Sequence, residues 1–451
     1  MLPTGELRDD IAGRFILPGD DDYDAARRVV AGNVDRRPAL IARVAGADDV
    51  ARVIALARET GHELAVRGGG HSNAGHGVSE GGIVLDMRDM RGLEIDADQR
   101  TAWAQAGLTA GGYTKAADAH ALATGFGDTA SVGVAGITLA GGAGFLARKH
   151  GLTIDHLLAA EVVTADGELV RADAGQHPDL FWALRGGGGN FGVVTRLKYR
   201  LHEVGTIVGG MLILPASADV IAAFLEAAHE APDELSTIAN VMKAPPMPFL
   251  PAEAHGRMIV MAQLVYAGDV DAGQRVLDRF RALATPIADM TRPMRYPEIF
   301  PPEDPDYRPT AVVRTMYVNG VDRDKGQAIV ERIQTATAPM AVAQLRVLGG
   351  AVARVSPDAT AFAHRRSPIM ANVVAMYQGE DHRAEQEAWV AALTAELYDG
   401  ADGAYAGFLA DEGAERVRAA YPGATWDRLR EVKATYDPDN VFRLNQNVPP
   451  G

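Results

Sequence analysis

The spacing of apolar residues divides the chain into stretches of different texture. In roughly the first 205 residues, short apolar runs alternate with polar or glycine-rich segments, which is typical of short strands joined by loops and helices. After the first strand, apolar residues at helical spacing predict a helix that Asp48 caps and Gly61 ends. An Asp166-Gly167 pair predicts a two-residue hairpin turn. The predicted strands are 38–44, 64–66, 83–86, 93–95, 101–104, 158–165, 168–172 and 193–199.

After about residue 205 the glycines become rarer and the amphipathic segments become longer. Runs of strands with helices between them predict an antiparallel sheet covered by helices on one face, so the fold class is α+β. The residues from 411 onward form a third segment, with a helix near 426–434 that ends before Asp437-Pro438. The predicted helices are 217–231, 269–284, 322–337 and 384–398, and the predicted strands are 258–262, 310–318, 342–348 and 369–377.

Length and composition limit the classes of protein to consider. A chain of 451 residues exceeds what one hydrophobic core usually serves, so we expect two domains. No run of about 18 apolar residues is present, and the start has neither a basic region nor an apolar core, so we expect no membrane span, no signal peptide and a cytoplasmic location. The net charge of −15 argues against binding of nucleic acid.

The chain contains no cysteine. This single count excludes disulfides, thiolate nucleophiles, cysteine-ligated zinc and iron–sulfur clusters. His71 and His76 have a spacing that could form a metal pair, but neither a carboxylate nor a third histidine accompanies them. We therefore predict no metal site.

Three glycine clusters carry the strongest signal for binding, and they occupy residues 67–73, 133–144 and 185–192. Successive glycines leave backbone N–H groups unshielded, so such loops can wrap phosphate groups at close range. None of the clusters has the GxxxxGK[ST] pattern of a nucleotide hydrolase. None forms a strand–GxGxxG–helix unit followed by an acidic residue, as a Rossmann site requires. The clusters therefore indicate a phosphate-bearing cofactor that is held rather than cleaved.

Three motifs resemble one known family: RGGGHS at 67–72 followed by GIVLDM at 82–87, LRGGGGNFGVVT at 184–195, and YDPDNVFRLNQN at 436–447. They are similar to the vanillyl-alcohol oxidase / p-cresol methylhydroxylase superfamily and, within it, to berberine-bridge-enzyme-like oxidoreductases of the 6-hydroxy-D-nicotine oxidase type. The resemblance runs from about residue 35 to 450. It implies an FAD-binding domain over 1–205, an inserted substrate-binding domain over 206–410, and a C-terminal segment over 411–451 that returns to the FAD domain.

By this resemblance, His71 is the residue bonded covalently to FAD, and a neutral imidazole is a competent nucleophile. The alternative is a histidine that only caps the turn. Thr129 stands where many relatives have a second, cysteine attachment, so we expect one covalent bond. Val132 stands where relatives control oxygen access, which implies an oxidase; the alternative is ordinary strand packing. The predicted cofactor-binding residues are Arg67, Gly68, Gly69, Gly70, His71, Ser72, Thr129, Val132, Gly133, Gly136, Gly141, Gly142, Gly144, Gly192, Val193, Val194, Asn445 and Asn447.

Alternation along the strand at 342–348 should place Gln344 and Arg346 on one face, and the resemblance implies that this face looks across the flavin. No carboxylate accompanies them there, so a cationic nicotine-like amine is a poor fit. Arg346 could instead bind a carboxylate or a polarised carbonyl, or it could be an exposed strand arginine. Tyr317 and Tyr377 each end a strand and could act as a base or hydrogen-bond donor, or could belong to the core. We name Tyr317, Tyr377, Arg346 and Gln344 as catalytic candidates.

Two further motifs are open to a structural or a functional reading. His364, in the TAFAHR run at 360–365, resembles a family motif at the junction of the domains, where a structural role competes with a catalytic one. The amides of Asn445, Gln446 and Asn447 lie on the returning tail and could hold a flavin carbonyl or the substrate.

The expected function is hydride transfer from a small or medium secondary-metabolite alcohol, amine or ring C–H to the flavin N5 atom. Dioxygen is the expected acceptor, and the expected partners are thus a small-molecule substrate and O2. The alternatives are a dehydrogenase with another acceptor and a flavin-binding protein without turnover. We expect a monomer or a homodimer.

Overall fold

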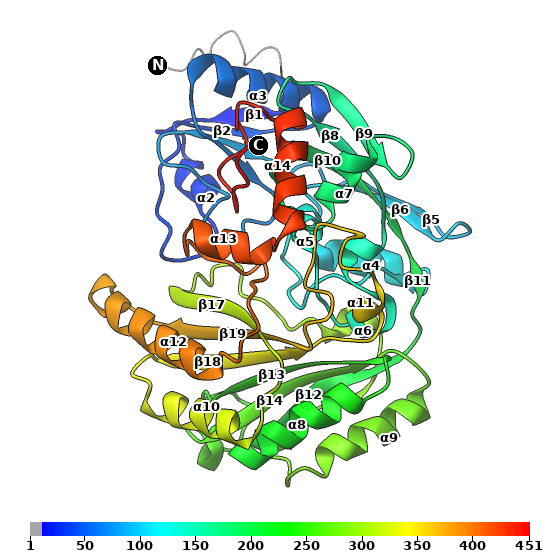
Figure 1. The fold of residues 1–451 in the computed structure, drawn as a ribbon, viewed down its shortest axis with the longest axis vertical. Coiled ribbons are helices and arrows are strands. Elements are labelled where there is room, and N and C mark those ends of the chain that lie inside the picture. The colour runs from blue at the N-terminus through cyan, green and yellow to red at the C-terminus, as the bar shows by residue number, and fades with distance from the viewer. Residues whose placement is uncertain (1–10) are drawn as a thin grey trace.

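The computed structural model describes residues 11–451, and their strands form four β-sheets (Figure 1). Residues 1–10 lie outside the described residues. The start of the chain, where we expect no signal peptide, falls partly in this range. Within the described residues, no helix is long and apolar enough to cross a bilayer. Both the N-terminal and the C-terminal segments lie in the upper part of the molecule in Figure 1, while the largest sheet and its helices form the lower part.

The first sheet places the first glycine turn at its edge. Its strand order is β1-β2-β4-β3, in which β2, β4 and β3 run parallel and β1 pairs antiparallel with β2. A helix, α3, connects β2 to β3, as a crossover between parallel strands requires. Gly68 leaves the sheet directly after β3. The elements are β1 (Arg14–Ile16), α2 (Tyr23–Arg27), β2 (Leu40–Arg43), α3 (Ala47–Thr60), β3 (Leu64–Arg67) and β4 (Ile83–Asp86).

The second sheet is antiparallel and has the order β5-β6-β10-β8-β9, and a small pair of strands, β7 with β11, lies apart from it. The second and third glycine clusters lie in the connections of this region. The elements are β5 (Leu93–Asp96), β6 (Thr101–Gln105), α4 (Ala110–Asp118), β7 (Leu122–Ala123), α5 (Val134–Ala140), α6 (Ala147–His150), η1 (Thr153–Asp155), β8 (Leu157–Val163), β9 (Leu169–Asp173), α7 (Pro178–Leu184), β10 (Val193–Arg200) and β11 (His202–Glu203).

The largest sheet has eight strands among the described residues and is antiparallel throughout, with the order β15-β12-β14-β13-β18-β19-β17 and with β16 paired to β12. Its strands are β12 (Ile207–Pro215), β13 (Leu235–Lys243), β14 (Met258–Tyr266), β15 (Ala288–Asp289), β16 (Arg292–Met294), β17 (Ala311–Val318), β18 (Met340–Val347) and β19 (Ile369–Met376). The short helices η2 (Ala252–Ala254), η3 (Tyr296–Ile299), α11 (Ala351–Arg354) and η4 (Glu380–His382) lie in its connections.

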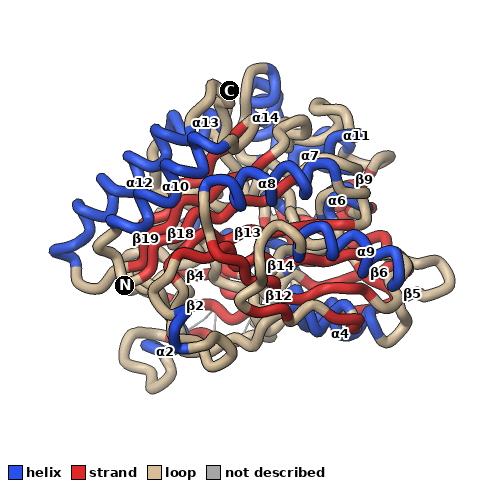
Figure 2. Tube along the Cα trace, turned by 90° about the horizontal axis from the view of Figure 1, so that it is seen from below, coloured by secondary structure: helices blue, strands red, loops and turns tan. Residues whose placement is uncertain are grey.

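Four amphipathic helices cover one face of this sheet, as Figures 1 and 2 show. Phe224 of α8, Phe280 of α9 and Ile333 of α10 pack in one apolar cluster with sheet residues such as Leu212 and Val373. The helices are α8 (Ala218–Glu230), α9 (Val270–Arg281), α10 (Arg323–Thr335) and α12 (Arg383–Leu397). The α+β fold with an antiparallel sheet covered on one face is therefore confirmed.

The C-terminal residues return to the first part of the molecule. Tyr421, Leu429 and Phe442 share an apolar core with residues of the first two sheets. The helices of this segment are α13 (Ala414–Ala420) and α14 (Ala424–Tyr436). The boundaries at residues 205 and 410 stay predictions.

Local details differ from the sequence prediction in three places. Asp48 does not cap α3: the helix begins after Gly46, and the neighbouring Asp49 carboxylate accepts hydrogen bonds from backbone N–H groups that include that of Ala45. The hairpin of β8 and β9 exists, but its turn is longer than two residues, because the last strand pair is Val163 with Leu169. The strands β12 and β13 were not predicted, because glycines interrupt the apolar run of β12 and polar residues interrupt that of β13.

Candidate functional site

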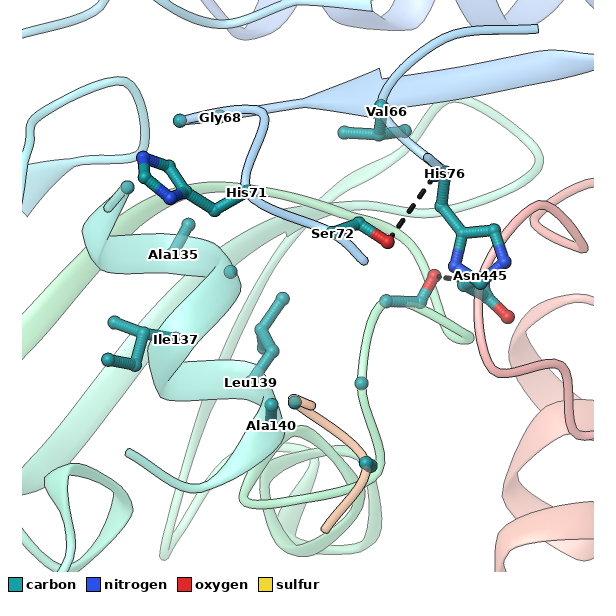
Figure 3. A pocket seen from close by; sticks show the side chains of 18 of the residues that line it. Val66, Gly68, His71, Ser72, His76, Ala135, Ile137, Leu139, Ala140 and Asn445 are labelled. Carbon is teal, nitrogen blue, oxygen red and sulfur yellow. Dashed lines mark hydrogen bonds between the residues drawn. The ribbon is translucent and has the colours of Figure 1, made fainter. Parts of the chain in front are cut away.

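A cavity with a volume of about 410 Å³ lies where the three glycine clusters meet the C-terminal tail. Its size is in the range of ligand and cofactor sites. One wall is the turn after β3, and another is α5, which carries Ala135, Ile137, Leu139 and Ala140 along the cavity in Figure 3. The loop 188–194 and the tail residues 442–446 complete it. Segments that are far apart in the sequence therefore build one site.

The glycines of this wall fit a bound FAD because side chains would either clash there or fill the cavity. A Cβ atom on Gly69 would lie 2.4 Å from the backbone nitrogen of Gly133, so the two loops touch through their backbones. A Cβ atom on Gly136 or Gly189 would meet no atom within 4 Å and would project into open space. Gly70 and Gly188 have φ angles of +75° and +74°, which favour glycine. Backbone N–H groups thus remain accessible to phosphate oxygens.

Orphaned polar atoms on the wall point to the same conclusion. The Oδ1 atom of Asn445 and the hydroxyl of Tyr421 are buried without a hydrogen-bond partner, and both residues line the cavity. A bound molecule with polar groups would satisfy them, since buried polar groups are normally hydrogen-bonded. These residues would therefore hold FAD, whose isoalloxazine and ribityl groups carry such donors and acceptors.

His71 lies on the wall of the cavity, in the turn with Gly68 and Ser72 (Figure 3). Its Nε2 atom is 2.9 Å from the hydroxyl of Ser131, with which it shares a hydrogen bond. Burial lowers the pKa of the His71 imidazole, although the Glu303 carboxylate nearby raises it. The ring is therefore neutral at pH 7, the state in which imidazole is a nucleophile.

His76 also lines the cavity, but its chemistry differs. Its backbone N–H donates to the Ser72 hydroxyl at 3.4 Å, and burial lowers the pKa of its imidazole to about 4. No group of three or more histidine, aspartate or glutamate side chains within residues 11–451 is placed to hold a metal ion.

Arg67 lines the cavity, but its guanidinium is paired with a buried carboxylate of the protein. The guanidinium donates to the Asp86 carboxylate at 2.8 Å, and both side chains are fully buried. Burial would raise the pKa of Asp86, but the charges of Arg67 and Arg88 outweigh it and lower the pKa to about 2. The side chain of Arg67 packs against Gly70 and Gly77. Arg67 thus fixes the glycine turn to the end of β4.

The tail is fastened to the third glycine cluster by a buried ion pair. The Lys433 ammonium donates to Asp437 at 2.6 Å, to the Asn190 carbonyl at 2.7 Å and to the Phe442 carbonyl at 2.9 Å. The Asp437 carboxylate also accepts from the backbone N–H of Phe442. Asn445 then donates to the Gly189 carbonyl at 3.1 Å. This explains the YDPDN motif: it turns the chain so that Asn445 reaches the cavity.

Thr129 and Val132 both line the cavity, on the segment before α5. The Thr129 hydroxyl donates to the carboxylate of Asp128 at 3.3 Å. Asp128 is the one carboxylate on the wall among the described residues. It was not singled out in the sequence, although it directly precedes Thr129.

Most of the predicted cofactor residues lie on the wall: Arg67, Gly68, Gly69, Gly70, His71, Ser72, Thr129, Val132, Gly133, Gly136, Gly192, Val193, Val194 and Asn445. Gly141, Gly142, Gly144 and Asn447 do not line it. The N–H of Gly142 donates to the Tyr405 hydroxyl at 2.9 Å, and a Cβ atom on Gly144 would lie 1.2 Å from the Phe126 carbonyl oxygen. These glycines serve turns and close packing, and their contact with FAD stays a prediction.

None of the four catalytic candidates lines the cavity. Arg346 is buried rather than exposed, and its guanidinium donates to Asp128 at 2.6 Å and to Gln344 Oε1 at 2.9 Å. With these partners Arg346 holds Asp128 from outside the lining of the cavity. Gln344 in turn donates to Asn240 at 3.0 Å. The catalytic roles of both residues stay predictions.

The two tyrosines lie in the core. Tyr317 is fully buried, and its ring stacks on that of His364 at a centroid distance of 4.8 Å. Burial raises the pKa of its hydroxyl far above the ordinary value, so it is a poor base. Tyr377 is also buried, and its backbone N–H donates to the Thr310 carbonyl. Their places favour the core interpretation over the catalytic one.

His364 and its motif also make contacts within the core. His364 is buried, and its Nε2 atom is 3.0 Å from the Ala419 carbonyl oxygen. The neighbouring Arg365 donates twice to the Asp155 carboxylate, at 2.7 and 2.8 Å, and once to Thr360. The motif therefore ties the large sheet and the C-terminal segment to η1.

The segment 405–409 contributes several wall residues that sequence reasoning missed. Tyr405, Ala406, Gly407, Phe408 and Leu409 all line the cavity. The ring of Phe408 lies 5.1 Å from the Arg346 guanidinium, and the Phe408 carbonyl accepts from Asn73 at 2.9 Å. The alternation of small and aromatic residues in GAYAGF, just before the C-terminal segment, was the available signal.

Comparisons with known proteins agree with this site. Residues 38–173 match the model of the FAD binding domain family, and residues 404–449 match the model of the family described as berberine and berberine like. The chain is 30% identical to (R)-6-hydroxynicotine oxidase of Paenarthrobacter nicotinovorans over 98% of this chain and 97% of that protein.

Solved structures show the same fold. 6-Hydroxy-D-nicotine oxidase from Arthrobacter nicotinovorans superposes with a TM-score of 0.86 at 27% identity, covering 98% of each chain. Glucooligosaccharide oxidase from Acremonium strictum superposes with a TM-score of 0.84 at 23% identity, covering 97% of each chain.

The fold and the site thus define an FAD-dependent oxidoreductase. The chain belongs to the berberine-bridge-enzyme-like family of FAD-linked oxidases, in the superfamily of vanillyl-alcohol oxidase and p-cresol methylhydroxylase.

Proposed function

We propose that the protein holds one FAD covalently through His71 and uses it to oxidise a small or medium secondary-metabolite alcohol, amine or ring C–H bond, with dioxygen as the electron acceptor. The observation that carries the proposal is a neutral, half-buried imidazole in the wall of a cavity built by three glycine loops.

The absence of cysteine limits the number of covalent bonds. The FAD of the Acremonium strictum oxidase is 6-S-cysteinyl and 8α-N1-histidyl, that is, bonded to a cysteine and to a histidine. This chain has no cysteine, and Thr129 lines the cavity in the region of the predicted second attachment. Only the histidine bond remains for it.

When bound, FAD accepts a hydride from the substrate at its N5 atom. The residues of this chain bind and orient both molecules: glycine N–H groups approach the phosphates, and Asn445 offers its free Oδ1 atom. The Asp128 carboxylate is the wall group best suited to accept a hydrogen bond from a substrate hydroxyl or amine. Arg346 orients Asp128 from behind.

The nature of the wall supports a largely apolar substrate. Ile137, Leu139, Ala140 and Ala143 form one side, and Tyr405 and Phe408 add aromatic surface. With FAD in the cavity, the apolar part of this wall that remains for a substrate would favour an aromatic or aliphatic body, and Asp128 is the one carboxylate of the lining, among the described residues, that is available to its polar group.

The experiment that tests this function is an anaerobic screen of alcohols, amines and aromatic metabolites, in which substrates are recognised by the loss of the visible absorbance of oxidised flavin. Admission of air should then restore the absorbance and produce hydrogen peroxide. If no compound of a broad panel reduces the flavin, the alternative of a binding protein without turnover replaces the proposal.

A variant at Val132 distinguishes between an oxidase and a dehydrogenase. The Val132→Ile variant adds one methylene group to the wall and should slow reoxidation by dioxygen, whereas reduction by the substrate should change little. Equal reoxidation rates for the variant and the unchanged protein would mean that Val132 does not control oxygen access. Slow reoxidation of the unchanged protein would favour another electron acceptor.

A further inference from the structure

The ring of His71 is held by Ser131. Its Nε2 atom shares a hydrogen bond with the Ser131 hydroxyl, at 2.9 Å, and the Ser131 backbone also interacts with the ring. His71 lines the cavity and Ser131 does not. The ring therefore reaches from the cavity wall back to Ser131 with its Nε2 atom.

Two features outside the ring fix Ser131 in this place. The segment 131–133 packs against the His71 turn so closely that a Cβ atom on Gly69 would lie 2.9 Å from the Ser131 carbonyl oxygen. From the other side, one carboxylate oxygen of Glu303 accepts the backbone N–H groups of Ala130, at 2.6 Å, and of Ser131, at 3.2 Å. Backbone contacts thus fix the position of Ser131, and with it the hydroxyl that is hydrogen-bonded to Nε2.

A neutral imidazole has a proton on one ring nitrogen and a lone pair on the other, and a nitrogen that is held by a protein group is not available to a bound molecule. We propose that Ser131 is a positioning residue that holds the Nε2 edge of the His71 ring away from the cavity and so leaves Nδ1 as the nitrogen that attacks FAD in covalent attachment. The inference rests on the proposed covalent link through His71.

The attachment step balances in this arrangement. Nδ1 forms a bond to the 8α carbon of FAD, while one C–H bond at that carbon and the N–H bond at Nε2 break. The electron pair passes to the isoalloxazine ring and from there to dioxygen, which leaves with the two protons as hydrogen peroxide. The product imidazole has no proton on Nε2, and the Ser131 hydroxyl can then donate to that atom, since a hydroxyl both accepts and donates.

Charge near the ring favours the same step. Formation of the Nδ1 bond places positive charge on the imidazole before the Nε2 proton leaves. The Glu303 carboxylate, which among the charged groups raises the pKa of His71 most, stabilises this charge, and Asp128 acts in the same direction. Arg308 opposes them.

The test compares the covalent fraction of bound flavin in the unchanged protein and in the Ser131→Ala and Ser131→Thr variants, each purified and then incubated with added FAD in air. Flavin that stays in the acid-precipitated pellet is covalent. Ser131→Ala should bind FAD but become covalent at least about tenfold more slowly, because the hydrogen bond that orients the ring is lost. Ser131→Thr keeps the hydroxyl and should restore most of the rate. Ser79→Ala, a buried serine without a hydrogen-bond partner, is the matched control and should be unchanged.

A second measurement is independent of the variants. Nitrogen NMR of the flavin-bearing peptide from the unchanged protein identifies the ring nitrogen that carries FAD, and we expect Nδ1. Attachment at Nε2, or a Ser131→Ala variant that becomes covalent as fast as the unchanged protein, would overturn the inference while the covalent link itself stands. Flavin released from the unchanged protein would overturn the covalent link and with it the inference.

Discussion

Arg346 illustrates how a buried charge joins the large sheet to the cofactor cavity. Its guanidinium is surrounded by acceptors: the Asp128 carboxylate, the Gln344 amide and, at 3.5 Å, the Ala143 carbonyl. An arginine so fully paired stabilises the position of its partners rather than binding a ligand. The orientation of Asp128 in the wall is therefore set from the far side, by a strand more than 200 residues away.

Removing this arginine should cost stability. In Arg346→Met, the Asp128 carboxylate loses its charged partner while it stays partly buried, so the free energy of unfolding should fall by about 1–3 kcal/mol. Denaturation in urea measures the change. Arg354→Met removes an arginine whose pair with Asp233 is exposed, and it should change stability by less than about 1 kcal/mol. Equal losses in the two variants would contradict this account of Arg346.

Individual wall residues could be predicted from the sequence only where the signal comes from neighbouring positions along the chain. Glycine runs reveal an accessible backbone, so the residues from Arg67 to Ser72 and those around Gly133 were found. Ser131 and Asp128 were not found, because their roles depend on His71 and on Arg346, which are neighbours only in space. Gly142 is required by packing against Thr153, and a glycine of this kind has the same sequence signal as one that contacts a ligand.

Helix α14 has a role that its polar sequence hides. Lys433 is fully buried and holds Asp437 and two carbonyl groups of the chain beyond the helix and in the third glycine cluster. Burial lowers the pKa of the Lys433 ammonium, and the hydrogen bond with Asp437 opposes this shift. The helix therefore anchors the tail that completes the cavity.

Breaking this anchor should release the tail. Lys433→Met leaves the Asp437 carboxylate buried and without its charge partner, which should destabilise the protein by about 3–5 kcal/mol. Limited proteolysis should cut the tail of the variant faster, and urea denaturation should give the loss of stability. Lys115→Met, at an exposed lysine of α4, is the control and should behave as the unchanged protein. A tail in Lys433→Met that resists proteolysis as well as that of the control would contradict the anchoring role.

Three histidines meet where α6, η1 and β11 come together. The Nε2 atom of His202 and the Nδ1 atom of His156 are 2.9 Å apart, and the rings of His150 and His202 stack at 4.0 Å. Burial lowers the pKa of His150 and His156 to about 3 and that of His202 to about 4, and the charges of Lys149 and Arg200 add to the effect. All three rings are neutral in the folded protein at pH 7.

This cluster makes folding stability depend on pH in a defined direction. The unfolded histidines take up protons near pH 6.5 and the folded ones only near pH 3 to 4. The contribution of these histidines to the free energy of unfolding is therefore fully present above pH 6.5. It is lost progressively as the pH falls toward 4. The melting temperature measured between pH 7.5 and 4.5 should fall less steeply for His202→Gln than for the unchanged protein. His120→Gln, at an exposed position, should keep the original slope, and a His202→Gln slope equal to it would contradict the prediction.

Elements with strong periodicity were predictable, and those with interrupted patterns were not. The helices α8, α9, α10 and α12 lie within three residues of their predicted bounds, because each has a continuous apolar face. The strand β12 was missed because Gly209 and Gly210 stand in its middle; at Gly210, whose φ is +138°, a Cβ atom would lie 2.3 Å from the Met290 carbonyl. Such a close approach of two chain segments is a tertiary feature.

The molecule as a whole joins three sheets and a tail around one cofactor site. The first two sheets and the returning tail build the cavity, and the large sheet reaches it through the pair of Arg346 and Asp128. The buried pair of Arg365 with Asp155 adds a second link between these parts. The family follows from motifs spread over the whole chain, whereas the substrate depends on wall residues that no motif identifies.

We propose that a single histidine holds the flavin, and acid precipitation of the purified protein separates covalent from released flavin. The purified protein should be yellow and its flavin should stay in the pellet, whereas a His71→Ala variant should still bind FAD in its glycine loops but release it to the supernatant. Flavin in the supernatant of the unchanged protein, or a His71→Ala variant that keeps its flavin in the pellet, would show that His71 is not the attachment site.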